Sequence, residues 1–335
     1  MVDRHAWEEP GAFEELPGVF RIPLPLPGDA LKAVNVYAIV DDDKVVLVDS
    51  GWAMAESQDL LGRSLDSIGF GLGDIREFLV THVHRDHYTQ AVAIRRTYGT
   101  SVSLGEGERI SLEAIHTISA HPDIANLHAA GALGLSQVIA GWQGDRDLTD
   151  WAAPDRWLDD GLELPLHSRT LRVIATPGHT QGHVVFHDPQ HQALFAGDHV
   201  LPHITPSIGV ELERAPSPLR DYLSSLQLIR ALPDTRLLPA HGPVTASTAD
   251  RIDELLRHHE ERLTETGKAV EAGATSGFEV ANILTWTRRG RHFDELDTFN
   301  QILATHETMA HLEVLVERGW LRRDTVDGIV RFARA

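Results

Sequence analysis

The chain contains no cysteine among its 335 residues. This absence excludes disulfide bonds, thiolate zinc sites, iron–sulfur clusters and a cysteine nucleophile. Any metal ion must therefore be held by histidine and carboxylate side chains. The sequence also lacks an uncharged apolar run long enough to span a bilayer, and its start shows no cationic region followed by an apolar stretch. We therefore expect a cytoplasmic protein with no membrane partner.

Basic residues are scarce. Thirty Lys and Arg stand against 49 Asp and Glu, which gives a net charge of -19. This charge repels polyanions, so we expect a small-molecule substrate rather than nucleic acid as the partner. Apolar residues make up 42% of the chain, which is ordinary for a globular protein of about two domains. The unusual feature is the content of 20 His, which directs attention to where they cluster.

Short apolar segments with strand composition alternate with segments of helical spacing, which predicts an α/β protein. Apolar spacing predicts helices around residues 60–68 and 219–229. Several of the predicted strands run directly into His or Asp. The predicted strands are GVFRIPLPL (18–26), AVNVYAIV (33–40), KVVLVDSG (44–51), IREFLVT (75–81), LRVIATP (171–177), HVVFHD (183–188), QALFAGD (192–198) and TRLLPA (235–240).

The character of the sequence changes near residue 248, where an amphipathic helix with a charged outer face begins. A second helical segment, a long helix from about Asp294 to Glu317 and strand-like pieces from Trp320 to Phe332 follow. This order is typical of a winged helix. We therefore predict a catalytic domain over residues 1–247, with a helical insertion at about 105–160, and a small, mainly helical winged-helix-like domain over residues 248–335.

The densest group of metal-binding side chains lies directly after a predicted strand, in the string THVHRDH (residues 81–87). It holds His82, His84, Asp86 and His87 within six residues. Imidazole and carboxylate groups at this spacing on one loop are suited to binding metal ions. The alternative is a solvated polar loop, which the position after an apolar strand disfavours.

Three further candidate ligands stand at the ends of other predicted strands. They are His179 in TPGHTQGH, Asp198 in LFAGDH and His241 in LPAHGP. Loops at one edge of a sheet meet in a common cleft, so these side chains can join those of the first loop.

Seven ligands fit two divalent ions, because each ion needs about three protein ligands, a shared group and an open position for water. Zinc is the first choice, although such ligands also accept iron or manganese. The predicted sets are His82, His84 and His179 for one ion, Asp86, His87 and His241 for the other, and Asp198 as the bridge between them.

The strings THVHRDH, TPGHTQGH, AGD and PAHGP, preceded by VLVDSG with Asp49, resemble in their order the five signature motifs of the metallo-β-lactamase superfamily. The resemblance covers residues 18 to 247 and implies a four-layered αββα sandwich. It implies that Asp49 supports the metal loop from behind. A bridging Asp at position 198 is similar to the pattern of glyoxalase-II-like thioesterases, lactonases and nucleases rather than that of zinc β-lactamases.

The sequence resembles most closely the β-lactamase-like protein 2 group, which has HRDH in the metal loop and a winged-helix C-terminal domain. Tyr88-Thr89-Gln90 replaces the small residue and two glycines that usually follow the loop in that group. This departure leaves the substrate open.

Residues beside the ligands have weaker predicted roles. Asp86 is expected to bind metal and also to orient the attacking water or carry its proton. Tyr88 either donates its hydroxyl to a substrate oxygen or packs the helix that follows. His183 is expected to support the site without binding metal, and Asp49 to accept from an imidazole N–H. Five others either line or cover the cleft or occupy exposed-loop or core positions: His121, His199, His203, Trp142 and Trp151.

The sequence thus favours a dinuclear hydrolase in which a metal-bridging hydroxide attacks a carboxylic ester, thioester or lactone. The first alternative is a phosphodiesterase or ribonuclease like the β-lactamase-like protein 2 group. A ligand-sensing regulator that binds DNA is disfavoured, because residues 276–335 carry nearly equal numbers of acidic and basic side chains. An iron-dependent oxygenase with one metal is a third alternative. The tail is expected to pack on the catalytic domain or to form a homodimer contact.

Overall fold

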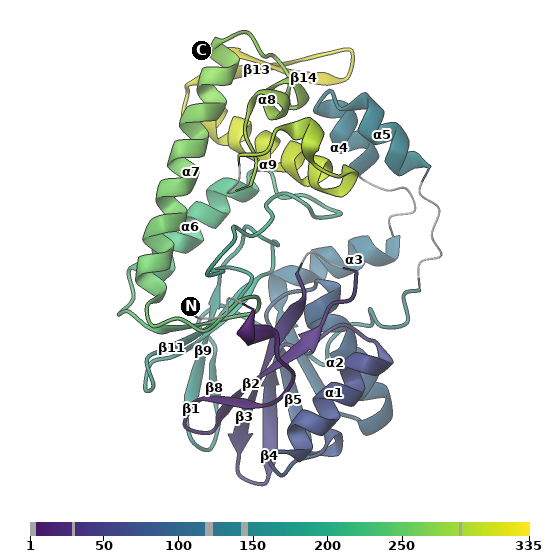
Figure 1. Ribbon diagram of the computed structural model, residues 1–335, viewed down its shortest axis with the longest axis vertical. Coiled ribbons are helices and arrows are strands. Elements are labelled where there is room, and N and C mark those ends of the chain that lie inside the picture. Colours follow the sequence, from purple (N-terminus) through teal and green to yellow (C-terminus); the bar gives the residue numbers. More distant parts are fainter. Residues whose placement is uncertain (1–4, 29–30, 118–122, 142–146, 288–289) are drawn as a thin grey trace.

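The computed structural model describes residues 5–28, 31–117, 123–141, 147–287 and 290–335. Two β-sheets form the lower half of the molecule, and a group of helices lies above them (Figure 1). Short 3-10 helices connect the larger elements: η1 (Ala6–Glu8), η2 (Leu72–Asp74), η3 (Glu106–Glu108) and η4 (Phe293–Glu295).

The first sheet has seven strands that lie side by side in sequence order. The first four pair antiparallel, and the remaining pairs are parallel. The strands are β1 (Phe13–Leu16), β2 (Val19–Pro25), β3 (Ala33–Asp41), β4 (Lys44–Val48), β5 (Ile75–Val80), β6 (Ser101–Gly105) and β7 (Arg156–Leu158).

The second sheet has five strands in the order β12-β11-β10-β9-β8. Only β11 and β12 pair parallel, and helix α6 connects them. The strands are β8 (Glu163–Pro165), β9 (Thr170–Ala175), β10 (Val184–Asp188), β11 (Ala193–Gly197) and β12 (Arg236–Pro239).

Alternation along the strands places apolar side chains on both faces of each sheet. Val46 and Val48 of β4 pack in the cluster between the two sheets, together with Phe186 of the second sheet, whereas Leu47 points to the opposite face. That outer face is covered by α1 (Ala55–Asp66) and α2 (Arg85–Tyr98), and the outer face of the second sheet by α6 (Pro218–Arg230). The predicted four-layered αββα sandwich is therefore confirmed.

The predicted insertion at 105–160 contains helices, but they pack in two different places. α3 (Arg109–Thr117) packs against the first sheet, whereas α4 (Asp123–Ala129) and α5 (Leu133–Ala140) share a hydrophobic cluster with the C-terminal helices. His306 Nε2 lies 3.0 Å from Asp123 Oδ1 and links α9 (Thr298–Glu317) to α4. The core of the C-terminal elements thus includes helices from the middle of the chain.

The C-terminal part follows the predicted order of three helices and a hairpin. The long helix begins at Thr298 rather than at about Asp294, because Asp297 caps it by accepting from the main-chain N of Asn300 at 2.9 Å. The elements are α7 (Thr248–Glu271), α8 (Gly277–Ile283), α9 (Thr298–Glu317), β13 (Leu321–Val326) and β14 (Ile329–Arg334). No helix in the described part of the chain offers an apolar stretch that could cross a membrane.

The strands predicted from the sequence are all present in the described residues. Four of the described strands were not predicted: β1, β6, β7 and β8. β6 (SVSLG) offers only two large apolar residues, Val102 and Leu104. β7 and β8 have three residues each, and β1 contains two glutamates in four residues, so none of these three carries a clear apolar alternation.

Candidate metal centre

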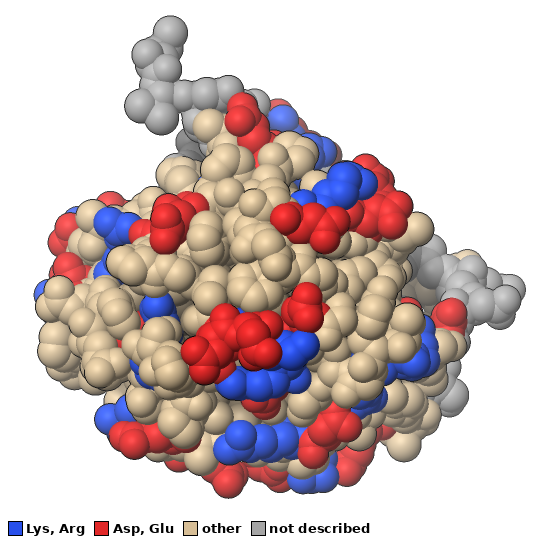
Figure 2. Space-filling model, turned by 90° about the horizontal axis from the view of Figure 1, so that it is seen from below, with Lys and Arg blue, Asp and Glu red and all other residues tan. Residues whose placement is uncertain are grey.

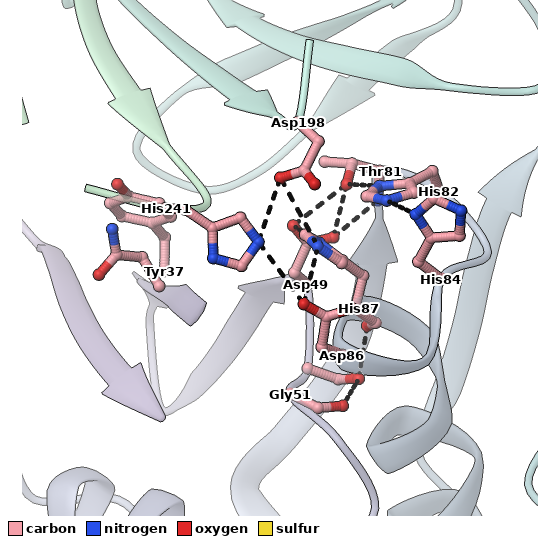
Figure 3. Close-up of polar contacts among 12 residues, drawn as sticks. Tyr37, Asp49, Gly51, Thr81, His82, His84, Asp86, His87, Asp198 and His241 are labelled. Atoms are coloured by element: carbon pink, nitrogen blue, oxygen red, sulfur yellow. Dashed lines mark hydrogen bonds and ion pairs between the residues drawn. The ribbon is translucent and has the colours of Figure 1, made fainter. Parts of the chain in front are cut away.

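The predicted ligands converge from the ends of separate strands. His82 follows β5, His179 lies between β9 and β10, Asp198 follows β11 and His241 follows β12. The remaining predicted ligands lie in the turn before α2 and in its first turn. Figure 3 shows Asp198 directed toward His241 and His87, with the metal loop beside them. The structure brings all seven together.

The first group, called the three-histidine cluster, consists of His82, His84 and His179. Nδ1 of His84 lies 3.0 Å from Nε2 of His82 and 3.0 Å from Nε2 of His179. Burial lowers the pKa of His84 to about 3 and that of His179 to about 4, and the pKa of His82 also lies well below its usual value. Three neutral imidazoles therefore direct ring nitrogens at one point.

The second group, called the Asp86 cluster, consists of Asp86, His87 and His241. Asp86 Oδ2 lies 3.6 Å from His87 Nε2 and 3.5 Å from His241 Nε2. These two nitrogens are fully buried and have no hydrogen-bond partner, although nearly all buried polar atoms in proteins have one. Burial acts to raise the pKa of Asp86, but the imidazoles around it lower the pKa below its usual value.

Asp198 faces both groups. Its Oδ1 lies 3.3 Å from His241 Nε2 and 3.7 Å from His87 Nε2, and its Oδ2 lies 3.5 Å from His179 Nε2. Oδ1 is also buried without a hydrogen-bond partner. One carboxylate thus presents one oxygen to each cluster, as a bridging ligand requires.

Four of the imidazoles are fixed by their outer ring nitrogen. In each ring the outer nitrogen is Nδ1, which donates to a main-chain carbonyl in two cases and to a carboxylate in one. Nε2 is therefore the nitrogen that faces the site. Thr81 has one proton, which it gives to Asp49, so it accepts from His82. The acceptors are Thr81 Oγ1 for His82 (3.0 Å), Asp49 Oδ2 for His87 (2.9 Å), Ser207 O for His179 (2.8 Å) and Ala33 O for His241 (2.8 Å).

Asp49 has the predicted supporting role. Its Oδ1 accepts from the main-chain N (2.8 Å) and the hydroxyl (2.9 Å) of Thr81, and its Oδ2 accepts from His87 Nδ1. Its backbone has φ +60°, a conformation unusual for a residue other than glycine. Burial opposes charge on His87, but the nearby carboxylates raise its pKa to about 10. Positive charge is therefore favoured at this imidazole, either as a proton on Nε2 or, in its place, as a bound metal ion.

His183 supports Asp198 and has no free ring nitrogen for a metal. Its Nε2 accepts from the main-chain N of Asp198 at 3.2 Å, and its Nδ1 donates to Thr176 Oγ1 at 2.9 Å. Gly197 makes this approach possible, because a Cβ at that position would lie 2.7 Å from Thr81 Oγ1 and 2.8 Å from His183 Nε2. These contacts agree with the prediction that His183 supports the site without binding metal.

Sequence reasoning missed the residues that hold the His241 loop. Asn35 Nδ2 donates to the carbonyls of Pro239 (3.0 Å) and Gly242 (2.8 Å), and the hydroxyl of Tyr37 donates to Pro239 O at 2.9 Å. Asn35 stands among apolar residues within a predicted strand. A polar amide in an otherwise buried strand was the available signal.

Tyr88 does not face the clusters. Its side chain is fully buried, its hydroxyl donates to Ala152 O at 2.6 Å, and burial raises its pKa. Its ring packs beside Trp151, with 6.4 Å between the ring centroids. Tyr88 follows His87 on the first turn of α2, where successive side chains point about 100° apart. Its side chain therefore packs in the core under the helix and does not face the ligands.

The other weighed residues occupy different surroundings. His199 is fully buried against Tyr222, with ring centroids 5.4 Å apart, and belongs to none of the ligand groups found among the described residues. His203 is exposed. His121 and Trp142 lie outside the described residues.

The donor set fits divalent metal ions. Ligand atoms of His82, His84 and His179 lie within 4.8 Å of one another, as do those of the Asp86 cluster. The orphaned atoms of His87, His241 and Asp198 would gain partners if a cation were bound. Neutral imidazoles and ionised carboxylates are the forms that bind metals.

Comparison with known proteins identifies the family. Residues 30–241 match the family described as "Metallo-beta-lactamase superfamily", which is more than half of the chain. The chain belongs to the metallo-β-lactamase superfamily. Residues 263–335 match "Metallo-beta-lactamase-like, C-terminal domain". The prediction of a metallo-β-lactamase superfamily hydrolase, with the divalent metal binding that the family implies, is confirmed.

Two curated relatives match different lengths of the chain. A Caenorhabditis elegans protein named beta-lactamase-like protein 2 homolog is 35% identical over 126 residues, covering 38% of this chain and 40% of that protein. An Aspergillus fumigatus protein named atrochrysone carboxyl ACP thioesterase is 24% identical over 248 residues, covering 73% of this chain and 47% of that protein. The matches therefore span less than half the length of each relative.

A solved structure extends the similarity to the whole chain. The metallo-β-lactamase family protein from Thermus thermophilus is 27% identical, with a TM-score of 0.73. The alignment covers 96% of this chain and 100% of that chain. The shared fold therefore includes the C-terminal helices as well as the sandwich.

Proposed function

We propose that this protein is a dinuclear metal-dependent hydrolase that acts on a carboxylic ester, thioester or lactone. The observation that carries the proposal is the position of Asp198, whose two oxygens face two different ligand clusters. A carboxylate placed between two groups of imidazoles is the arrangement that a pair of cations needs. Zinc is the first choice for this donor set, and iron and manganese are the alternatives.

Each side chain has a defined role in this proposal. The three-histidine cluster would hold one cation and the Asp86 cluster the other, with Asp198 between them. When bound, a pair of divalent cations activates water and polarises the substrate oxygen under attack. Asp86 lies at the edge of the site, with 17% of its side chain exposed, where it can accept the proton of the attacking water. Tyr88 is not part of this machinery, because its one proton is donated to Ala152.

The substrate class rests on charge and on one relative. The net charge of -19 opposes a polyanionic substrate. On the face seen in Figure 2, Lys and Arg side chains lie interspersed with Asp and Glu rather than in a broad basic patch. The relative named as an acyl-carrier-protein thioesterase matches 73% of this chain, which supports the thioester class. The second candidate is a phosphodiesterase or ribonuclease, the activity implied by the resemblance to the β-lactamase-like protein 2 group, and a relative named as a homolog of that protein matches 38% of this chain.

The C-terminal part is proposed to be a winged-helix-like domain over residues 248–335. The order α7, α8, α9 and hairpin supports this proposal, as does the family match over residues 263–335. The near balance of acidic and basic residues within 276–335 favours packing over DNA binding. Absence of duplex DNA binding at low salt is the expected result, and tight, salt-dependent binding would instead support the regulator alternative.

The test combines metal analysis with a substrate comparison. We expect the purified protein to hold two divalent ions per chain and to hydrolyse an acyl thioester or nitrophenyl ester faster than bis(nitrophenyl) phosphate. Activity on the phosphodiester alone would establish the second candidate and contradict the first. One iron per chain would favour the oxygenase alternative.

A further inference from the structure

A buried glutamate connects two separate loops of the three-histidine cluster. Glu108, in η3, is fully buried. Its Oε1 accepts from the hydroxyl of Thr180 at 2.5 Å and from the main-chain N of Val83 at 3.3 Å. Val83 stands between His82 and His84, and Thr180 follows His179. One carboxyl oxygen therefore joins the chain segments that supply all three histidines.

Close packing keeps the glutamate against the His179 loop. A Cβ at Gly182 would lie 1.9 Å from the main-chain N of Glu108 and 2.5 Å from its Cγ. A Cβ at Gly107 would lie 2.8 Å from the Cα of Gly182. Only glycine permits this approach, so η3 and the His179 loop are held in direct contact.

A second buried carboxyl holds the same loop. Glu211 Oε1 accepts from the main-chain N of Gln181 at 2.8 Å and from Ser111 Oγ at 3.4 Å. Burial first, and then the neighbouring Glu108, raises the pKa of Glu211 to about 8. Burial also raises the pKa of Glu108, whose Oε2 has no hydrogen-bond partner. Two carboxyl groups whose burial is unfavourable thus lie beside the loop that carries His179.

We propose that Glu108 is a positioning residue that sets the geometry of the three-histidine cluster and leaves the Asp86 cluster unaffected. The proposal rests on the proposed function, because it assumes that these histidines bind metal. Without the Oε1 acceptor, Val83 N–H and Thr180 O–H would both lose this bond, and the two loops would lose their common contact. The nitrogens of His82, His84 and His179 would then be held less firmly at one point.

The experiment measures Zn²⁺ affinity separately at each cluster, by competition with a chelator. His241→Ala leaves only the three-histidine cluster intact, and His84→Ala leaves only the Asp86 cluster intact. We expect Glu108→Ala to weaken Zn²⁺ binding about 10- to 100-fold in the His241→Ala background, which is the usual range for lost supporting contacts. In the His84→Ala background we expect no change. Equal losses in both backgrounds, or no loss in either, would overturn the proposal.

Two gentler variants separate positioning from misfolding and from charge. Glu108→Gln keeps an oxygen acceptor of the same shape, so its Zn²⁺ affinity should match that of the wild type, and a loss as large as that of Glu108→Ala would contradict the acceptor role. Thr180→Val removes one donor and keeps the packing, so it should cause a smaller loss at the same cluster only. If Thr180→Val has no effect on that cluster, the Thr180–Glu108 bond has no positioning role and the proposal fails.

The matched control is Glu106→Gln, an exposed position in the same 3-10 helix that pairs only with Arg109 among the bonds described there. It should leave both affinities unchanged, and a loss in this variant would count against the proposal. A wild-type protein that retains no Zn²⁺ would overturn the proposed function together with this inference. A wild type that binds two ions while Glu108→Ala shows no selective loss would overturn the inference alone.

Discussion

The molecule buries histidines in two regions, and the two groups differ in what surrounds them. At the sheet edge, imidazoles point their inner nitrogens toward Asp86 and Asp198. Between α7 and α9, His259 Nδ1 lies 3.2 Å from His311 Nε2, and His311 Nδ1 donates to Glu307 O at 2.7 Å. Three of the four ring nitrogens of this second pair are thus bonded within the pair or to the main chain, and His259 Nε2 is buried without a hydrogen-bond partner.

The two regions differ in whether ligand atoms from several residues face one point, and not in how deeply the histidines are buried. Among the described residues, groups of three or more ligand atoms within 4.8 Å of one another occur only at the metal centre. His259 and His311 are as buried as the ligands, yet no carboxylate completes a set around them. A buried imidazole therefore indicates a metal site only where carboxylate oxygens face the same point and the outer nitrogen is already bonded.

Removing the bridging carboxylate should have the largest effect. In Asp198→Ala, each cluster loses one shared oxygen, so metal content should fall from two ions to about one. Activity should fall roughly 100- to 1,000-fold, because several kcal/mol of transition-state stabilisation depends on the metals. Elemental analysis and steady-state kinetics measure both. Full occupancy and wild-type activity would refute the bridging assignment.

Removing the carboxylate that holds His87 of the Asp86 cluster should have the next largest effect. Both oxygens of Asp49 accept, from Thr81 on one side and from His87 on the other. In Asp49→Asn, the amide NH₂ must face one of these donors, so metal affinity should fall about 10- to 100-fold. Asp42→Asn is a matched control, because Asp42 also has positive φ but its side chain is exposed. The assignment of Asp49 is wrong if the two variants retain the same affinity.

The histidines between α7 and α9 should affect stability and not metal content. His311→Leu leaves His259 Nδ1–H without its partner, which should lower the free energy of unfolding by about 1–3 kcal/mol. Both metal ions should remain bound. Denaturant unfolding and elemental analysis check these two expectations. Loss of one metal ion would contradict the expectation that this second pair of histidines does not affect metal binding.

The difference in unfolding free energy between the wild type and His311→Leu should also depend on pH, which is a smaller effect. Burial lowers the pKa of His311 from its usual 6.5 to about 3, so between these values the unfolded chain binds the proton more readily than the folded chain. The stability of the wild type should therefore fall as the pH drops from 6.5 toward 3, and this contribution is absent in His311→Leu. Burial, the largest cause, also holds the pKa of His259 well below its usual value, and His259 is present in both proteins. The difference in unfolding free energy between them should shrink with falling pH, and a constant difference would contradict this account.

Local patterns in the sequence predicted an α/β protein, and the resemblance to the metallo-β-lactamase superfamily implied the sandwich. Local patterns also predicted that the candidate ligands would lie close together. Apolar runs specify strands, and a ligand that directly follows a strand must lie at the sheet edge. THVHRDH and PAHGP carry this signal in a few consecutive residues.

The rest depends on contacts between distant residues. Asn35 is 204 positions from Pro239, and Glu108 is 72 positions from Thr180, and no local pattern pairs them. Likewise, α4 lies in the predicted insertion but packs with α9, because a short amphipathic helix does not specify which apolar surface it will cover. Tyr88 shows the same limit, since its place beside the ligands in sequence does not fix the direction of its side chain.

Tyr88→Phe should have the smallest effect and sharpens the boundary of the metal centre. The hydroxyl donates to Ala152 O and the ring packs in the core of the first sheet, so removing the oxygen should cost about 1 kcal/mol of stability. Because the hydroxyl does not face the ligands, kcat and KM for an ester or thioester should stay at wild-type values. Thermal unfolding and steady-state kinetics separate these effects. A selective fall in kcat without a loss of stability would contradict this expectation. It would show that the Tyr88 hydroxyl takes part in the reaction, although its hydrogen bond is directed away from the ligands.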